Sequence, residues 1–349
     1  MRSLPYWLFF AVPAVTVLGL HAGGMWTLAG LALVFVAIPV LEQLLGLRTD
    51  NEGTEGPARR FAYDLPLWVW IPVQLGVQIH GLQLVLSGEL APMEIVITIL
   101  AIGLLSGGGG INIAHELMHR RSAVERAAAE LLMASASYTH FCIEHVHGHH
   151  RHVATPRDAA SSRLGESLYA YLPRTFVGSF RSAWRIEAAR ARRLGIPWWS
   201  LRHRMTRYLA TQAILYTVLL AVSPLAVVYW AGQGLFAATL LETINYVEHY
   251  GLRRRELSPG RFERVQPWHS WNAAHRLTNW VLFNLQRHSD HHFLASRTYP
   301  QLRHHDDVPQ LPAGYATMIL VALVPPLWRR MMDRRVAQWN ERSATAEAA

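Results

Sequence analysis

The stretch MEIVITILAIGLLSGGGGINIAHELMHRR, residues 93–121, joins an apolar run of membrane-spanning length to two histidines spaced four residues apart. Two more histidine clusters follow, HVHGHH (145–150) and HSDHH (288–292), and His249 closes another apolar run. Imidazole nitrogens are common ligands of iron, zinc and copper in proteins. The sequence therefore predicts a membrane protein that carries a multi-histidine metal site.

The spacing within the clusters suits metal binding. On an α-helix, residues three or four positions apart lie on one face, with about 5–6 Å between their Cβ atoms, so both can reach one ion. His115/His119 and His145/His149 have this spacing, and the third cluster repeats it. One ion takes roughly four to six ligands. Eight candidate imidazoles in the clusters, with His249 as a ninth, therefore suit two ions.

The apolar residues are concentrated in six runs, and a helix needs roughly 17–25 residues to cross a bilayer. The sixth run is short, and the Ala-Gly-Gln-Gly sequence at 231–234 predicts a break before it. We expect one all-α integral membrane domain. It comprises spans at 4–20, 26–47, 65–86, 93–113, 208–230 and 235–249, a histidine-rich helical cap at 114–207 and 250–340, and a disordered tail at 342–349.

Arginine indicates the orientation of these spans. The loops at 21–24 and 87–90 carry no arginine, whereas Arg48, Arg59 and Arg60 lie between the second and third spans. The 114–207 segment carries many more arginines. Basic residues concentrate on the cytoplasmic side of membrane proteins. We therefore expect both termini and the histidine clusters to be cytoplasmic.

Charge and cysteine content exclude several classes of function. The net charge is +9 and the chain has no lysine, so arginine supplies all 33 basic side chains. No nucleic-acid-binding motif accompanies them; they flank the spans, where anionic lipid attracts them, or could meet an acidic soluble partner. A single cysteine, Cys142, excludes an internal disulfide and a cysteine-based zinc or iron–sulfur site.

Acidic residues near the histidines form a second set of candidates. A metal-bound histidine usually gives its other N–H to a carboxylate or carbonyl. Asp290, within the third cluster, is the best placed acid for this role; direct ligation is the alternative for each acid. Glu242 lies inside an apolar span, where a charged residue is costly and usually functional. Its side chain either faces the metal cavity or points elsewhere, and the sequence leaves both open. The supporting candidates are Glu116, Glu144, Glu242, Glu248, Asp290, Asp158, His140 and His269.

Four blocks resemble those of the membrane-bound non-haem di-iron alkane 1-monooxygenases, within the integral-membrane desaturase and hydroxylase superfamily. The blocks are HELMHR (115–120), EHVHGHHRHVATPRDAASSR (144–163), NYVEHYGL (245–252) and LQRHSDHH (285–292), in this order. The resemblance implies six membrane helices below a cytoplasmic cap that holds two irons. Its nine histidine ligands fall on His115, His119, His145, His149, His150, His249, His288, His291 and His292.

The resemblance also implies a reaction. One oxygen atom of O2 enters the terminal methyl C–H of a medium-chain n-alkane, the other leaves as water, and rubredoxin, reduced by a rubredoxin reductase, supplies two electrons. Unactivated C–H bonds resist acid, base and nucleophilic attack, so a redox metal that activates oxygen suits this chemistry. The implied location is a bacterial inner membrane. An alkane dissolves in lipid, so we expect it to enter a cavity among the spans.

The expected substrate channel is less closely defined. Glycines 107–110 would allow a substrate, or simply a neighbouring helix, to approach the backbone. The chain also resembles, more weakly, the xylene monooxygenase hydroxylase, so aromatic methyl groups are an alternative substrate. Chain length preference stays open. The candidate channel residues are Leu20, Trp26, Gly107, Gly108, Asn112 and Asn245.

Two other functions compete with alkane hydroxylation. A fatty acyl hydroxylase or desaturase would have similar histidine clusters and a different tunnel. A divalent-metal transporter should place its ligands near mid-span, whereas these clusters lie at the ends of spans or beyond. We expect Trp268 and Trp271 to be anchors at the membrane interface. Other histidines are expected to lie outside the metal site: His21, His80, His147, His152, His203, His275, His304 and His305.

Overall fold

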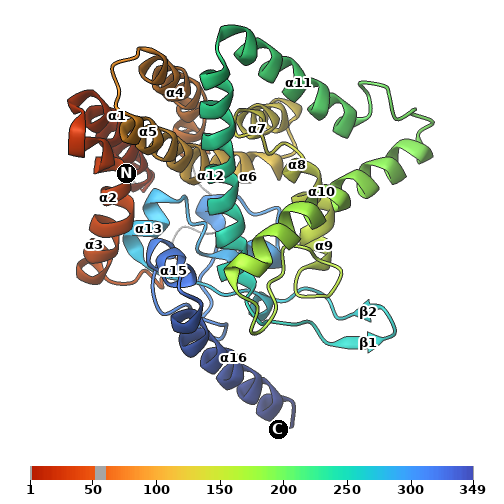
Figure 1. Ribbon diagram of the computed structural model, residues 1–349. Coiled ribbons are helices and arrows are strands. Elements are labelled where there is room, and N and C mark those ends of the chain that lie inside the picture. Colours follow the sequence, from red (N-terminus) through yellow and green to blue (C-terminus); the bar gives the residue numbers. More distant parts are fainter. Residues whose placement is uncertain (1, 52–59, 349) are drawn as a thin grey trace.

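The computed structural model describes residues 2–51 and 60–348, with side chains up to residue 340, and is almost entirely helical (Figure 1). Arg59, which contributes to the expected orientation, lies outside the described residues. In the described part of the chain, six helical segments are long and apolar enough to cross a membrane, which confirms the predicted fold class. They are Leu4–Ala22, Gly24–Leu45, Arg60–Leu86, Pro92–Met118, Arg204–Val222 and Pro224–His249.

The first two spans form a helical hairpin, and the third is a single long helix. The first span continues from a 3-10 segment into α1, and a π-helical turn joins α2 to α3 in the second. A methyl group on Gly30 would collide with the Thr16 side chain, so this glycine lets α2 pack closely on α1. The bounds are α1 Ala11–Ala22, α2 Ala29–Ala32, α3 Ile38–Leu45 and α4 Arg60–Leu86.

The fourth span is longer than predicted because the helix does not stop after the glycine tetrad. α5 (Pro92–Leu105) passes through a π-helical segment, Ser106–Ile111, into α6 (Asn112–Met118). A methyl group on Gly109 would lie 2.5 Å from the Trp70 ring, whereas one on Gly108 would meet nothing within 4 Å. The tetrad therefore serves close helix packing at one position and leaves open space at another.

The boundary between the fifth and sixth spans was predicted wrongly. α11 (Arg204–Val222) ends at Ser223, whose side chain accepts a hydrogen bond from Leu225 N, and α12 (Pro224–His249) begins with a proline at its first position. The expected break at 231–234 lies inside α12. Its polar residue, Gln233, is fully buried, and its side chain is hydrogen-bonded to Ser106 Oγ at 2.6 Å.

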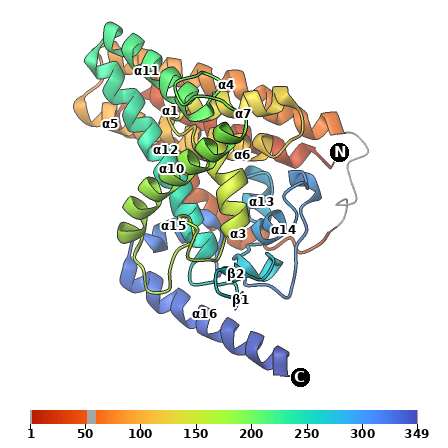
Figure 2. The ribbon, with the colours of Figure 1, turned by 90° about the vertical axis from the view of Figure 1, so that its right-hand side faces the viewer.

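The cap is formed by α7, the helical histidine segment, α10, a hairpin of β1 and β2, and the C-terminal helices. In Figure 2, α13–α15 and the hairpin lie together on one side of α4–α6, and α16 extends beyond them. α16 continues to Ala348, through the segment that the sequence predicts to be a disordered tail. The bounds are α7 Ala123–Ser135, α8 Phe141–Glu144, α9 His150–His152, α10 Leu168–Arg193, β1 Glu256–Ser258, β2 Arg261–Phe262, α13 Arg276–Val281, α14 His288–Phe293, α15 Tyr315–Ala322 and α16 Pro325–Ala348.

Candidate metal centre and adjoining cavity

Nine imidazoles converge where α6, the segment after α8, α12 and α14 meet, and they divide into two groups. Within each group, the nitrogens that could bind an ion lie within 4.8 Å of one another. The structure thus brings together all nine predicted histidines. The five-histidine group contains His115, His119, His145, His150 and His291, and the four-histidine group contains His149, His249, His288 and His292.

The two groups do not follow the predicted pairing of His145 with His149. A π-helical turn spans His145–His149, and its backbone hydrogen bonds join residues five apart rather than four apart, which widens the turn. His145 therefore shares a group with His150, and their Nε2 atoms are 3.0 Å apart. His149 turns to the other group. On α14, His291 likewise faces the five-histidine group, while its neighbour His292 faces the other.

Carboxylates contact the four-histidine group. His149 Nδ1 lies 2.9 Å from Asp158 Oδ2, and Ser161 Oγ donates a hydrogen bond of 2.6 Å to the same oxygen. Glu248 Oε2 lies 3.2 Å from His288 Nε2, and the Tyr315 hydroxyl donates to the other oxygen of Glu248. These contacts fix the orientation of the rings they touch.

Asp290 does not orient a histidine of the third cluster as predicted. Its carboxylate accepts hydrogen bonds from Arg303 N at 3.0 Å and from the Arg297 side chain, and lies 2.9 Å from His305 Nε2. The adjacent position on α14 points away from the neighbouring rings, so Asp290 ties the following loop to the helix instead. His305, expected to be incidental, belongs to this contact.

Burial makes most of these imidazoles neutral. Burial lowers the pKa of His119 to about 4, assisted by the charges of His149 and His147. Burial and neighbouring imidazoles likewise place the pKa of His145 and His291 well below the usual range. His149 differs: burial acts to lower its pKa, but Asp158 outweighs this and raises it to about 9. Neutral imidazoles keep a lone pair available for a metal.

Unpaired buried nitrogens support a metal at this place. Buried polar atoms without a hydrogen-bond partner are rare and call for an explanation such as a missing ion. His149 Nε2 and both ring nitrogens of His292 have no hydrogen-bond partner, and His119 Nε2 is also unpaired. Buried ring nitrogens that lie close together within each group and have no hydrogen-bond partner fit a metal ion.

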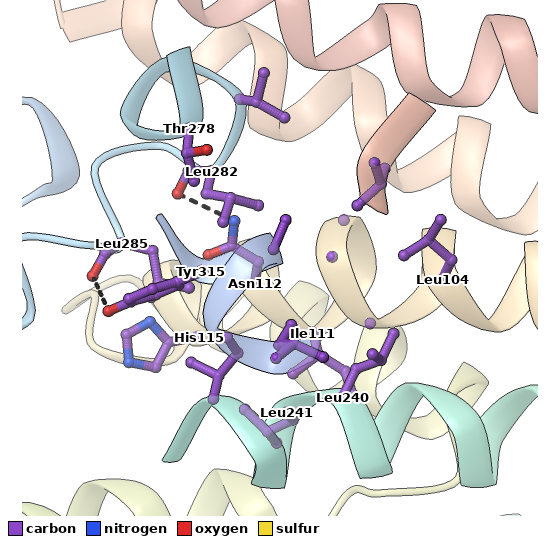
Figure 3. Close-up of a pocket in the computed structure, with 18 of the residues that line it drawn as sticks. Leu104, Ile111, Asn112, His115, Leu240, Leu241, Thr278, Leu282, Leu285 and Tyr315 are labelled. Atoms are coloured by element: carbon purple, nitrogen blue, oxygen red, sulfur yellow. Dashed lines mark hydrogen bonds between the residues drawn. The ribbon is translucent and has the colours of Figure 1, made fainter. Parts of the chain in front are cut away.

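An apolar cavity of about 120 Å³ adjoins the histidines. Figure 3 shows Asn112, His115 and Tyr315 gathered at one end, with Leu104 toward the other. The side chains come from the first, second, fourth and sixth spans, from α8 and the histidine segment after it, from α13 and the loop after it, and from α14 and α15. Those used below are Phe9, Val34, Phe35, Ile38, Leu104, Gly107, Gly108, Asn112, His115, His145, Leu240, Asn245, Glu248, Leu282, His288 and Tyr315.

The expected channel residues divide between this cavity and other places. Gly107, Gly108, Asn112 and Asn245 line it. Leu20 and Trp26 do not; Leu20 is buried elsewhere and Trp26 is 64% exposed near the start of its span. The second span instead contributes residues about two turns further along, because the cavity lies at the histidine end of the hairpin.

The remaining supporting candidates have other partners. Glu116 pairs with Arg120 at 2.6 Å, and Glu242 accepts from Tyr138 and Thr175 rather than facing a histidine of either group. His269 Nδ1 accepts from Gln266 N.

The sequence also singles out Glu144, His140 and Trp271. Glu144 is buried near Ser182, and His140 Nε2 is unpaired beside a second cavity. Trp271, expected at the membrane interface, is buried and donates to Tyr250 O at 2.9 Å. Its indole therefore supports the end of α12, and the expectation was wrong.

Sequence reasoning missed the cavity residues that lie far from the histidine blocks. Tyr315 lines the cavity and donates to Glu248, although it lies 67 positions away in the chain. Phe9, Val34 and Phe35 belong to spans that carry no polar signal at these positions. Only their apolar character was visible, and it does not distinguish a cavity wall from a lipid-facing surface.

Comparison with known proteins agrees with this architecture. The family model described as fatty acid desaturase matches residues 91–322. Alkane 1-monooxygenase 2 of Pseudomonas aeruginosa is 41% identical over 96% of this chain and 92% of its own. Alkane 1-monooxygenase 2 of Alcanivorax borkumensis is 40% identical over 98% and 92%. The xylene/toluene monooxygenase hydroxylase component of Pseudomonas putida is 29% identical over 99% and 92%. The chain is therefore a multi-pass membrane protein of the fatty acid desaturase family and belongs with its alkane 1-monooxygenases.

Proposed function

We propose that this protein inserts one oxygen atom of O2 into the terminal methyl C–H of medium-chain n-alkanes to give 1-alkanols. The other oxygen atom leaves as water, so each turnover consumes two electrons and two protons. The observation that carries the proposal is the apolar cavity whose lining includes His115, His145 and His288. A chain without polar groups fits such walls, and its methyl end would be presented to the histidines.

The proposed cofactor is a pair of iron ions, one in each histidine group. The five-histidine group would hold one ion and the four-histidine group the other. Bound there, iron supplies the redox chemistry that activates O2, which no side chain can supply. Asp158 and Glu248 would keep His149 and His288 oriented.

The chain's own contribution is to position the alkane and exclude water. Leu104, Leu240 and Leu282 would contact the hydrocarbon along the cavity. Apolar walls that exclude bulk water would also protect the reactive site from side reactions. Positioning the methyl group within reach of the histidine end then selects the terminal carbon.

The proposed electron donor is rubredoxin, itself reduced by a rubredoxin reductase, acting at the cytoplasmic face of a bacterial inner membrane. The hairpin β1–β2 and the adjoining loop form a basic face beside the histidines. We define this basic face by its exposed arginines, Arg151, Arg157, Arg253, Arg255, Arg261 and Arg264. Complementary charge would steer an acidic donor to this place.

The experiment is product analysis with purified protein of known metal content. The protein, loaded with iron, is supplied with rubredoxin, its reductase and O2, and offered separate n-alkanes, toluene and a fatty acyl substrate. We expect 1-alkanols and two irons per chain. Benzyl alcohol as the main product would favour the aromatic-methyl alternative, and unsaturated or hydroxylated acyl chains would favour the acyl alternative. Product formation by iron-free protein would contradict the iron proposal.

A further inference from the structure

Glu242 is a fully buried carboxyl group in α12 that neither histidine group uses. The Tyr138 hydroxyl donates to its Oε1 at 2.8 Å. Its Oε2 accepts from Thr175 Oγ1 at 2.8 Å and from Asn245 Nδ2 at 3.2 Å. These partners come from three separate segments, so the carboxyl group lies at a junction of the fold.

No arginine compensates this carboxyl group. None of the ion pairs formed by the described residues includes Glu242, although arginine supplies 33 side chains to the protein. An isolated buried carboxylate is costly, and inside a membrane span an acid commonly belongs to a functional pathway.

The surroundings of Glu242 accommodate both a carboxylate and a neutral carboxyl group. Tyr171 Oη lies 3.3 Å from Glu242 Oε2 and 2.9 Å from Ala160 O. When the tyrosine proton points to Ala160 O, its oxygen is free to accept a hydrogen bond from the protonated carboxyl group of Glu242. When Glu242 is ionised, the same hydroxyl can donate to it. The carboxyl group can therefore take up and release a proton without movement of any heavy atom.

Glu242 also lies between two cavities. A second cavity of about 520 Å³ is bounded by residues 136–140, α10, α11 and α12, and Tyr138 lines it. On the other side, Asn245 lines the cavity next to the histidines. The hydrogen-bonded series Tyr138–Glu242–Asn245 therefore crosses the protein from one cavity to the other.

The second cavity has polar groups near Tyr138. Thr139 Oγ1, His140 Nε2 and Gln212 Oε1 are buried and have no hydrogen-bond partner in the structure. Such atoms are commonly satisfied by ordered water. The end of the series at Tyr138 is thus a place where water can be held.

We propose that Tyr138 and Glu242 relay protons from the second cavity to the histidine end of the first. The inference rests on the proposed function, whose reaction consumes two protons in a site from which bulk water is excluded. In each passage, Tyr138 gives its hydroxyl proton to Glu242 and regains one from water in the second cavity. Glu242 then releases its proton to water held by Asn245. No electron moves, and two passages supply one turnover.

The first test measures proton exchange without turnover. Infrared difference spectra of the wild type and Glu242→Gln, both as full-length protein in lipid nanodiscs, identify the carbonyl stretch of the protonated Glu242 side chain. The shift of this band after transfer to D2O gives the exchange rate. We expect Tyr138→Phe to slow exchange about tenfold or more, because the ring stays and only the proton carrier is lost.

The matched control is Tyr229→Phe, which removes another buried tyrosine hydroxyl, one that donates to Gln78 O at 2.7 Å. Exchange should keep its wild-type rate in this variant. Equal exchange rates in Tyr138→Phe and wild type would overturn the relay. So would the absence of any band that Glu242→Gln removes.

The second test uses the iron-loaded protein and its electron donor. Glu242→Gln keeps the shape of the side chain but cannot pass on a proton. We expect hydroxylation to fall about 100-fold, the share of electrons lost as peroxide to rise, and the solvent deuterium isotope effect to change. A purely structural role would lower the amount of folded protein without altering coupling. Coupled turnover at the wild-type rate would overturn the proposal, whereas a wild type that oxidises no alkane would contradict the proposed function instead.

Discussion

The two histidine groups differ in the carboxylates that contact their rings. The four-histidine group has one imidazole fewer, but Asp158 contacts His149 and Glu248 contacts His288. Among the hydrogen bonds of the described residues, none joins the five-histidine group to a carboxylate. One ion would be held by more neutral ligands and the other by fewer ligands in a more negative setting.

The number of imidazoles in a group and the number of carboxylates that contact them therefore vary independently. Carboxylates behind imidazoles raise their basicity and fix their direction. The five-histidine group would hold its ion through the number of its imidazoles alone, without carboxylates that contact them. We therefore expect removal of one ligand to have unequal consequences in the two groups, and the following predictions test this inequality.

The largest expected effect is loss of an ion after a histidine is removed from the smaller group. His249→Ala leaves three imidazoles, whereas His119→Ala in the other group leaves four. We expect iron content to fall from two toward one per chain in the first variant and to stay near two in the second, with hydroxylation abolished in the first. Metal analysis of folded, membrane-inserted protein measures this. Equal metal loss in both variants would remove the proposed inequality.

The next effect concerns the carboxylate behind His149. Asp158→Asn preserves size but weakens the hydrogen bond that orients this ring. We expect metal affinity to fall about 10- to 100-fold, the usual cost of losing such a partner. Competition with a chelator measures the affinity. Asp290→Asn is the matched control, because Asp290 contacts Arg297 and His305 rather than a histidine of either group; an equal loss there would contradict the assignment.

The sequence shows which histidines form the site better than it shows how they divide into two groups. The nine histidines could be selected because their clusters end apolar runs. Their partition could not, because a π-helical turn at His145–His149 changes which rings face the same side. Local sequence does not reveal such a turn. Asp290 illustrates the same difficulty: adjacency in sequence suggested a partner, but the loop after α14 supplied different ones.

Spans were predictable where polarity changes sharply and uncertain where a polar residue is buried. The Ala-Gly-Gln-Gly sequence at 231–234 suggested a break, yet Gln233 is fully buried and hydrogen-bonded between helices, so α12 continues through it. The true break occurs one residue before Pro224, where Ser223 caps the next helix. Contacts between distant segments, such as Tyr315 with Glu248, required the folded structure.

A smaller effect is expected at the apolar cavity, which serves both groups. A side chain on Gly108 would extend into open space, and this residue lines the cavity. We expect Gly108→Val to shift the preferred n-alkane to shorter chains, with about a tenfold change in the ratio of rates for long and short substrates. This is the lower end of the roughly 10- to 200-fold that one methylene group contributes to specificity in an apolar pocket. Product ratios from mixed alkanes measure the shift.

The control for this cavity variant is Gly76→Val. Gly76 lies on α4 and is exposed. A methyl group added to it would also meet nothing within 4 Å, but Gly76 does not line the cavity. Its product ratio should match that of the wild type. An unchanged ratio in Gly108→Val would mean that the alkane does not reach this part of the cavity.

The smallest expected effect lies at the basic face and bears on which histidine group electrons reach first. Arg157 packs against the turn of the β1–β2 hairpin, beside Gly260, and its neighbour Asp158 contacts His149, so this face borders the four-histidine group. Replacing Arg261 and Arg264 with glutamate should lower rubredoxin-driven turnover severalfold at low salt and flatten its salt dependence, because surface charges are screened over about 10 Å. Arg193→Glu, at the exposed end of α10 far from the hairpin in Figure 1, is the matched charge reversal and should leave turnover unchanged. Equal effects of the two reversals would place the docking site elsewhere and leave the two groups equivalent toward the donor.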